Sequence, residues 1–247
     1  MIRTAQMLLH EALRRHTGSK QIEAFNDTEE AIFGIHRISQ VGITLGKKPG
    51  EWYGPQTVLH SLKGVSKMEP IKKFRIAVCS DGNIFLDKIF KKISNGNSVF
   101  VGIPMRLGIT KVMKEYLESI KLVFDIGQNV GIAGGQDHKS LYFTGIVNSH
   151  VNNDPHLLYL DPHFVQESSA KMTDAHLKTF QCAEVRALRL SKIATSVLVG
   201  FYLRNEADFE EWKYRVKALA KMENGVFSVY DKSPNYDDVP GNDDFFD

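Results

Sequence analysis

Two hydrophobic periodicities alternate along this chain of 247 residues, and each predicts a different kind of element. Apolar residues three or four positions apart indicate amphipathic helices, as in the first segment, where Ile2, Ala5 and Leu9 recur on one side. Runs rich in β-branched and aromatic residues indicate strands. The expected helices are residues 1–15, 54–62, 84–93, 110–122 and 206–220. The expected strands are residues 75–79, 98–103, 140–147, 157–160 and 197–203.

The order of these segments predicts an α+β fold. Helices come first and strands dominate later, which favours an antiparallel sheet packed against helices. Thr110 is expected to cap the helix that follows it. The glycines Gly131, Gly134 and Gly135 are typical of a connection between elements. The end of the chain, residues 231–247, is acidic and predicts a flexible tail.

One segment combines a strand-like run with residues that have catalytic chemistry. The apolar residues 157–160 lead directly into Asp161, Pro162 and His163. In an extended backbone, side chains two positions apart point the same way, so Asp161 and His163 would project together. A carboxylate beside an imidazole can fix its tautomer and stabilise its charged form, which is half of a thiol or serine hydrolase. The alternative for the tripeptide alone is a strand that ends in a proline turn.

Six stretches of the chain, one of which includes Asp161 and His163, match the motifs of a known protein family. They are MIRTAQMLL (1–9), GEWYGP (50–55), VGIPMRLG (101–108), GIAGG (131–135) with YFTG (142–145), YLDPH (159–163), and VGFY (199–202) followed by DFEEW (208–212). In this order they resemble the autophagin (Atg4) cysteine proteases, peptidase family C54. The resemblance implies a papain-like fold in which residues 1–230 form the peptidase domain. It also implies a small extra subdomain, which we place near residues 74–93.

The resemblance implies a function as well. Members of the family are thiol proteases (cysteine-type endopeptidases) of autophagy that cleave Atg8-like ubiquitin-like proteins after their C-terminal glycine. They also release the lipidated form from phosphatidylethanolamine at autophagic membranes. His163 would be the general base, oriented by Asp161. Trp52 would cover the cleft, and the glycine segment would be a loop that masks it and lifts when the substrate tail enters. The residues expected at the substrate cleft are Trp52, Gly134, Gly135 and Gln136.

The nucleophile of the family would directly precede Met1, so the chain as printed contains none. At that position a cysteine would stand at the N-terminus of the first helix, where free amides and the helix dipole favour a thiolate. We therefore expect an N-terminally truncated chain, begun at an internal methionine or at an incomplete gene model. The alternatives are an inactive member that binds Atg8-like proteins and a non-functional fragment. Cys79 and Cys182 lack an electropositive, partly exposed setting in the sequence and are expected to be structural.

Composition adds mainly exclusions. The formal net charge of +2 gives no reason to expect nucleic acid or an anionic membrane surface as the main partner. Two cysteines do not make a disulfide framework, and no secretory segment precedes the first helix. The apolar runs are shorter than the roughly 20 residues that a transmembrane helix needs. The nine histidines show no metal-ligand spacing, so we expect no metal and no cofactor. The cysteine usage and the lack of a secretory segment predict a cytoplasmic protein, and we expect it to be a monomer.

Overall fold

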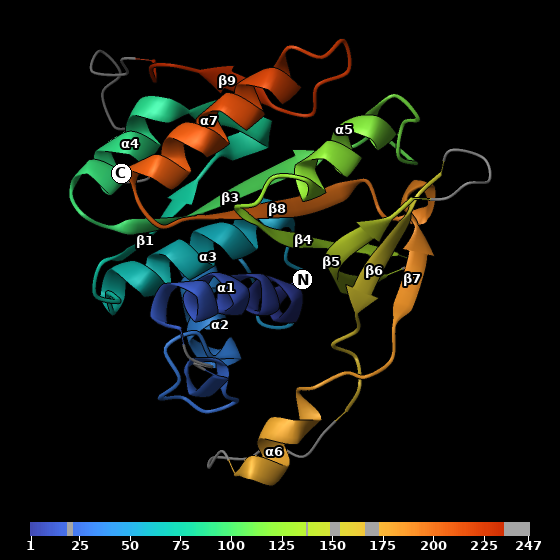
Figure 1. Ribbon diagram of the computed structural model, residues 1–247. Coiled ribbons are helices and arrows are strands. Elements are labelled where there is room, and N and C mark those ends of the chain that lie inside the picture. Colours follow the sequence, from blue (N-terminus) through green and yellow to red (C-terminus); the bar gives the residue numbers. More distant parts are fainter. Residues whose placement is uncertain (19–21, 137, 149–153, 166–172, 235–247) are drawn as a thin grey trace.

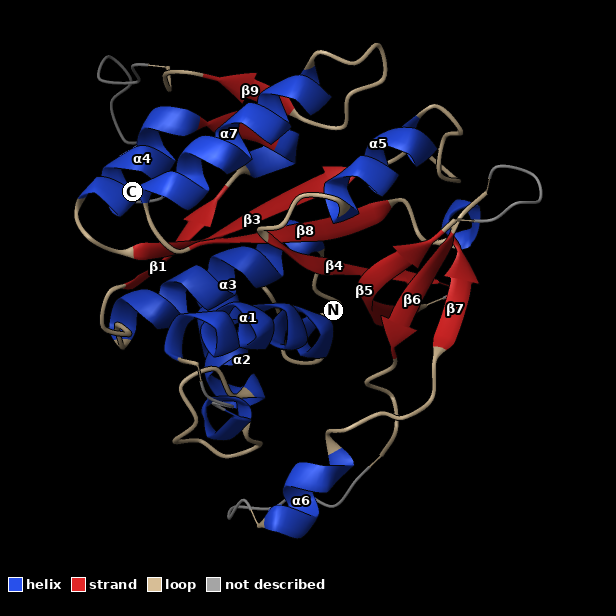
Figure 2. Ribbon diagram, viewed as in Figure 1, coloured by secondary structure: helices blue, strands red, loops and turns tan. Residues whose placement is uncertain are grey.

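A central β-sheet covered by helices on both faces organises the molecule (Figures 1 and 2). The structure, a computed structural model, describes residues 1–18, 22–136, 138–148, 154–165 and 173–234. The sheet has seven strands in the order β1-β3-β8-β4-β5-β6-β7. Their bounds are β1 (Phe74–Val78), β3 (Ser98–Arg106), β4 (Asn129–Gln136), β5 (Lys139–Val147), β6 (His156–Leu160), β7 (Arg186–Arg189) and β8 (Ser196–Leu203).

Five of the six strand pairings in this sheet are antiparallel, which confirms the expected α+β fold. The exception is β1, which pairs with β3 in parallel. A parallel pair needs a crossover connection, and the helix α4 (Leu86–Ser94) supplies it. A second, two-stranded parallel sheet joins β2 (Asn83–Phe85) to β9 (Ser228–Tyr230). The order of the elements in the sequence did not predict the two parallel strand pairs, β1 with β3 and β2 with β9.

The helices form two groups. Helices α1 (Ile2–Thr17), α2 (Ile35–Thr44) and α3 (Pro55–Met68) lie below the sheet in Figure 1. Helices α4, α5 (Tyr116–Phe124) and α7 (Glu206–Ala220) lie above it. A short helix, α6 (Asp174–Thr179), stands apart on the connection between β6 and β7. Three short 3-10 turns complete the described elements, at Ile22–Phe25, Ser80–Gly82 and Leu190–Lys192.

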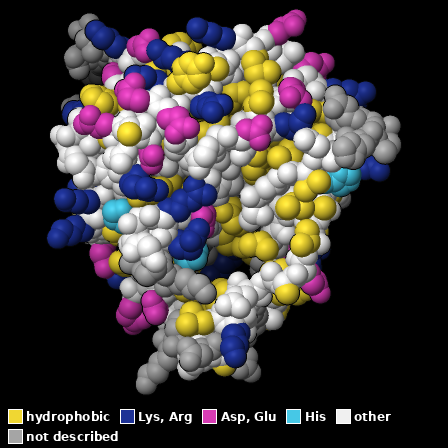
Figure 3. Space-filling view, in the orientation of Figure 1, with side chains coloured by type: hydrophobic (Ala, Val, Ile, Leu, Met, Phe, Trp, Pro, Cys, Tyr) yellow, Lys and Arg dark blue, Asp and Glu magenta, His cyan; other side chains and the backbone are white. Residues whose placement is uncertain are grey.

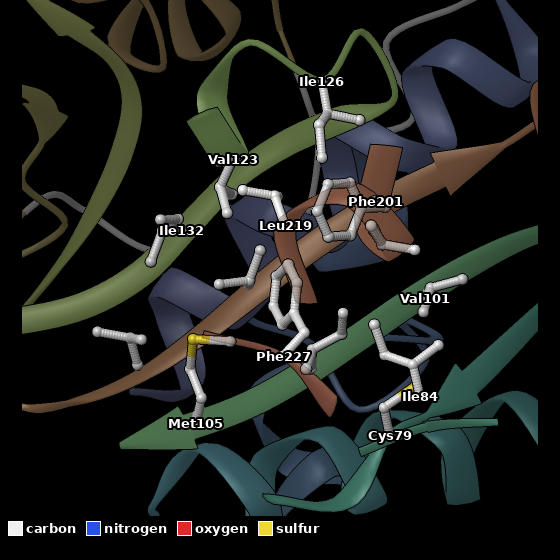
Figure 4. Close-up of a cluster of buried hydrophobic side chains, with 14 of the residues drawn as sticks. Cys79, Ile84, Val101, Met105, Val123, Ile126, Ile132, Phe201, Leu219 and Phe227 are labelled. Atoms are coloured by element: carbon white, nitrogen blue, oxygen red, sulfur yellow. The ribbon is translucent and has the colours of Figure 1, made fainter. Parts of the chain in front are cut away.

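The central strands β3 and β8 are apolar on both faces because each face of the sheet carries a core. Val101 and Phe201 point into the upper cluster with α4, α5 and α7 (Figure 4). Phe100 and Leu198 point into the lower cluster with α1, α2 and α3. Side chains alternate between faces along a strand, so a strand buried on both sides becomes a continuous hydrophobic run. The expected strands 98–103 and 197–203 are confirmed within two central elements of the sheet.

Helix α1 confirms the first expected helix and lies directly on the sheet. Its apolar stripe, which includes Ala5, Leu9 and Ala12, is fully buried, and the helix packs against β4, β5 and β8. The helix ends at Gly18, whose φ of 70° is the left-handed conformation that glycine adopts without steric cost. The apolar spacing therefore predicted both the element and the face that it buries.

The helix expected at residues 110–122 is only partly confirmed. Thr110 does not cap it, because α5 begins at Tyr116. The residues before it form turns instead: the N–H of Met113 donates to the carbonyl oxygen of Leu107 at 2.9 Å, and Gly108 has a φ of 149°. Helical periodicity extends across these turns in the sequence, but the helix begins about one turn and a half later than expected because the turns at Gly108 and Met113 come first.

The expectation that Gly131, Gly134 and Gly135 form a connection is wrong, because all three lie inside the buried strand β4. Their lack of a side chain allows close packing. A Cβ on Gly131, whose φ is 110°, would lie 2.5 Å from the carbonyl oxygen of Phe143. A Cβ on Gly135 would lie 2.2 Å from the carbonyl oxygen of Lys139. These glycines are therefore explained by the close approach of β5 rather than by the motion of a loop.

Residues 74–93, the segment expected to form a small subdomain, lie within the main body. Strand β1 is the edge of the seven-stranded sheet, and Ile84 and Ile89 belong to the same buried cluster as Trp212. The expected acidic tail lies mostly outside the described residues, at 235–247. Just before it, the N–H and Oγ of Ser233 donate to the carboxylate of Asp87, both at 3.0 Å.

Replacement of Gly131 by alanine tests the packing of β4. Gly131→Ala is expected to lower the free energy of unfolding by about 2–4 kcal/mol, because the new Cβ meets backbone and the φ is unfavourable for it. Gly127→Ala is the matched control, since a Cβ there meets no atom within 4 Å. Its effect should stay within about 0.5 kcal/mol. Equal urea unfolding curves for the two variants would contradict the packing described for β4.

Candidate active site

Asp161 and His163 form a hydrogen-bonded pair where β6 ends. Asp161 directly follows β6, and a proline after it disfavours a helical conformation at that position. One carboxylate oxygen, Oδ1, accepts the backbone N–H of His163 at 3.0 Å and its ring Nδ1 at 2.6 Å. An ionised carboxylate can only accept, so Nδ1 carries the proton. The local sequence thus builds a turn that fixes the imidazole.

The charge of Asp161 is stabilised by its surroundings. Burial raises the pKa of its carboxyl, but the two hydrogen bonds and the charge of His163, together with the positive charge of Lys139, outweigh that effect. The pKa of Asp161 is therefore lowered from its ordinary value. The side chain of Asp161 is 15% exposed and that of His163 is 41% exposed. The pair is thus fixed on the protein side and open to solvent at the imidazole.

Arg186 is a further partner that the sequence did not reveal. It lies on β7 opposite Tyr159 of β6, and its Nη1 is 4.0 Å from the second carboxylate oxygen of Asp161. Its guanidinium also lies over the ring of Phe164, 4.7 Å from the centroid. Strand β7 is short and half exposed, so its pairing with β6 left no clear signal in the sequence. Arg186 thus approaches Asp161 at the carboxylate oxygen that His163 does not use.

The N-terminus of α1 lies at the same end of the sheet. The hydroxyl of Thr4 is 2.7 Å from that of Ser140, near the start of β5, and Ser140 Oγ is 3.6 Å from the sulfur of Met1. Strand β5 pairs with β6 up to Tyr142 opposite Leu160, the residue before Asp161. Figure 1 shows the N-terminus beside these strands. The first turn of α1 and the Asp161–His163 pair are therefore held by neighbouring strands.

This arrangement suits acid–base chemistry next to a helix N-terminus. His163 uses Nδ1 to bind Asp161, and no described residue hydrogen-bonds Nε2. The first turn of α1 has no acidic side chain that would accept from its free backbone N–H groups. A thiol placed there would be favoured as thiolate by the helix dipole, and an imidazole could exchange a proton with it. The site can therefore serve a nucleophile that stands at the start of α1.

The residues expected at the substrate cleft are distributed over two elements. Trp52 precedes α3 and its side chain is 59% exposed. Its indole makes no hydrogen bond or ring contact with a described residue. Gly134 and Gly135 are buried in β4, and Gln136 ends that strand at the turn to β5. Among the described residues, no hydrogen bond, ion pair or ring contact joins Trp52 to Asp161 or His163, and the role of all four residues in a cleft stays a prediction.

The two cysteines occupy opposite settings. Cys79 is buried in the upper core (Figure 4), and burial raises the pKa of its thiol to about 12. This environment agrees with the structural role expected for it. Cys182 differs from the expectation in its setting, because it is exposed and its Sγ donates to the carbonyl oxygen of Glu184 at 3.4 Å. It precedes β7, where neighbouring side chains are also exposed, so packing does not shield it.

An apolar surface adjoins the pair. Figure 3 shows hydrophobic side chains gathered over the strands near the N-terminus, with a hollow between the body of the molecule and the arm that carries α6. Beyond His163, the exposed fractions are 59% for Phe164 and 99% for Val165. Between α6 and β7, the exposed fractions are 57% for Phe180 and 81% for Val185. Phe164 and Val165 thus expose apolar surface directly after His163, which is a feature of protein-binding surfaces.

Two further properties concern ligands and membranes. Among the described residues, no group of three or more His, Cys, Asp and Glu side chains is placed to hold a metal ion. None of the helices in the described part of the chain is both long and apolar enough to cross a bilayer.

Comparison with known proteins identifies related sequences. The profile of the Peptidase C54 catalytic domain matches residues 1–215. The chain is 32% identical over 240 residues to cysteine protease ATG4C of Mus musculus, a match that covers 92% of the chain and 50% of that protein. It is 32% identical over 263 residues to cysteine protease ATG4 of Saccharomyces cerevisiae, covering 97% and 51%. The probable cysteine protease ATG4 of Coccidioides immitis is 29% identical over 259 residues, covering 96% and 58%. The chain thus spans about half the length of these curated relatives.

The settings of the cysteines predict their reactivity. In the native protein at about pH 8, iodoacetamide should modify Cys182 but not Cys79, because the Cys79 thiol is buried and its pKa lies near 12. In the chain that begins at Met1, whose cysteines are Cys79 and Cys182, mass spectrometry should find one added group before unfolding in denaturant and two after it. Cys182→Ser should abolish the native uptake. Modification of Cys79 at a similar rate in the folded protein would contradict its burial.

The lowered pKa of Asp161 predicts a pH-dependent contribution to stability. A depressed carboxyl pKa stabilises the fold above the ordinary value of 3.8, and this stabilisation is lost as the pH falls through the folded-state pKa. Asp161→Asn should therefore lower the free energy of unfolding at neutral pH and lower it less at about pH 3. Asp125→Asn, at an exposed position after α5, is the control and should show no such change. A constant difference for Asp161→Asn between the two pH values would contradict this assignment.

Proposed function

The chain belongs to the Peptidase C54 family, and on that premise we propose that the protein is an autophagy thiol protease that acts on Atg8-like ubiquitin-like proteins. The observation that carries the proposal is the hydrogen bond between Asp161 and His163 beside the N-terminus of α1. A carboxylate-oriented imidazole next to a helix start is the part of a thiol protease that this chain can supply itself.

The nucleophile of the proposed enzyme is a cysteine directly before Met1. His163 Nε2 takes the thiol proton, and the thiolate attacks the carbonyl carbon of the scissile bond. His163 then returns that proton to the leaving amine as the bond to nitrogen breaks, which leaves a thioester. Water, deprotonated by the same imidazole, hydrolyses the thioester and frees the thiol. Asp161 holds the ring and stabilises its charge in both halves.

The proposed substrate is the C-terminal tail of an Atg8-like protein, cleaved after a glycine. The leaving amine belongs to a peptide in maturation and to phosphatidylethanolamine in delipidation, so one site serves both reactions. Trp52, Gly134, Gly135 and Gln136 form the proposed cleft. The exposure of Trp52 supports a role in covering a ligand, and the buried glycines of β4 suit a fixed wall rather than a moving loop. We propose that the enzyme works as a cytoplasmic monomer.

The first experiment reads the codons upstream of Met1. A cysteine encoded in frame directly before Met1 supports the protease. A stop codon or another start at that point would defeat it, and binding of an Atg8-like protein without cleavage would then indicate an inactive binder. Failure to bind and poor solubility would indicate a non-functional fragment.

Activity then tests the two residues assigned here. In the protein translated with its upstream residues, His163→Ala should lower the rate of Atg8 precursor cleavage by roughly 10⁴-fold or more. Asp161→Asn should cost roughly 10³- to 10⁴-fold, because the imidazole loses its fixed tautomer. His36→Ala is the matched control, since His36 is another half-exposed histidine whose ring lies 3.7 Å from a carboxylate, that of Asp27. Cleavage by His163→Ala at the unchanged rate would refute the proposed role.

A further inference from the structure

Two buried hydroxyl groups join the first helix to the sheet. Thr4 is fully buried on the first turn of α1, and Ser140 is 2% exposed near the start of β5. Their oxygens are 2.7 Å apart, an ordinary length for a hydrogen bond between hydroxyls. The sulfur of Met1 lies 3.6 Å from each of the two oxygens. The contact links residues 136 positions apart in the sequence.

The hydrogen atoms available make this contact a defined bond. Each hydroxyl can donate once. Thr4 Oγ1 is 2.8 Å from the carbonyl oxygen of Met1, and Ser140 Oγ is 3.0 Å from that of Gly134. If both hydroxyls donated to these carbonyls, two oxygen atoms would face each other at 2.7 Å without a proton. Thr4 and Ser140 therefore share a hydrogen bond, and one of the two carbonyl contacts takes the remaining proton.

The bond lies between the helix start and the catalytic pair. On one side, Thr4 is in the turn that begins at Met1, whose carbonyl oxygen also accepts the N–H of Ala5 at 3.0 Å. On the other side, Ser140 follows Lys139, whose charge acts on Asp161. Strand β5 then runs beside β6, which leads to His163. A shift at this bond would change the distance between the start of α1 and the imidazole.

We propose that Thr4 and Ser140 are positioning residues that hold the start of α1 at the correct distance from His163. The inference rests on the proposed function, because the group that they position is the cysteine before Met1. A thiol exchanges its proton with an imidazole only within hydrogen-bond reach. A misplacement of about 1 Å can lower a rate by about 10²-fold, so a single lost hydrogen bond at this place is costly to catalysis.

Steady-state kinetics test the proposal in the protein translated with its upstream residues, on an Atg8-like precursor extended beyond its terminal glycine. Thr4→Val keeps the shape of the side chain without its hydroxyl, and Ser140→Ala removes the other partner. Each should lower kcat by roughly 10- to 100-fold and leave KM within about two-fold. Thr4→Ser retains a hydroxyl and should stay within about three-fold of the unchanged protein. The double variant should be little slower than either single one, because both remove the same bond.

A second readout reports the nucleophile itself. The rate of alkylation of the cysteine before Met1, measured against pH, gives the midpoint of its thiol. An imidazole close to the thiol favours the thiolate, so Thr4→Val and Ser140→Ala should raise that midpoint by about one pH unit. Ser61→Ala is the matched control, because Ser61 is a fully buried serine whose Oγ donates to the carbonyl oxygen of Thr57 within α3. It should lower stability and leave both kcat and the midpoint unchanged.

The outcomes separate the two proposals. If the unchanged protein cleaves its substrate while Thr4→Val and Ser140→Ala retain kcat and the alkylation midpoint, the positioning role is wrong and the proposed function stands. If both variants lose activity only in proportion to the fraction unfolded in thermal melts, with the midpoint unchanged in the folded fraction, the bond is only structural and the inference fails. If the unchanged protein does not cleave at all, the proposed function fails and the inference fails with it.

Discussion

The close approach of α1 to the sheet is the constraint on which the candidate site depends. Gly200 of β8 lies beneath the helix, and a Cβ there would come within 2.9 Å of Leu8 and of Val130. The absence of that one side chain allows Leu8 to be fully buried against the strand. Because the helix rests directly on the strands, its first turn reaches the end of the sheet where β6 finishes. A larger residue at position 200 would lift the helix and move its first turn away from the sheet.

The sequence predicted those parts of the fold that depend on local patterns. The apolar stripes of α1 and α7, with apolar residues three or four positions apart, predicted helices that the structure confirms. A helix with one hydrophobic face is stable when that face is buried. Strands β3 and β8 were recognisable because burial on both faces makes them almost wholly apolar. Strand β4 was missed because its glycines are typical of turns, and only contact with Phe143 and Lys139 explains them. Secondary-structure propensity depends on the local sequence alone, whereas the glycines of β4 are required by tertiary contacts with β5.

The same distinction divides the candidate site. The contact between Asp161 and His163 could be expected from the sequence because it spans two residues and is built by one turn. Arg186 and Ser140 could not, since each reaches the site through strand pairing or helix packing across a long stretch of sequence. The position of Trp52 was expected from resemblance alone, and no local pattern fixes where its exposed ring lies. The candidate catalytic residues were thus easier to predict from the sequence than the residues that hold them.

The end of the sheet where β6 and β7 lie has a consequence for how the protein would lose its site. Strand β7 is an outer strand with β6 as its one neighbour, and most residues of both strands are at least partly exposed. The strands between the two cores, by contrast, are buried on both faces. Segments with few buried contacts open at lower free energy than the core. The two strands that bear the Asp161–His163 pair and Arg186 can therefore separate while the cores remain folded, so loss of the site's geometry on heating would precede global unfolding.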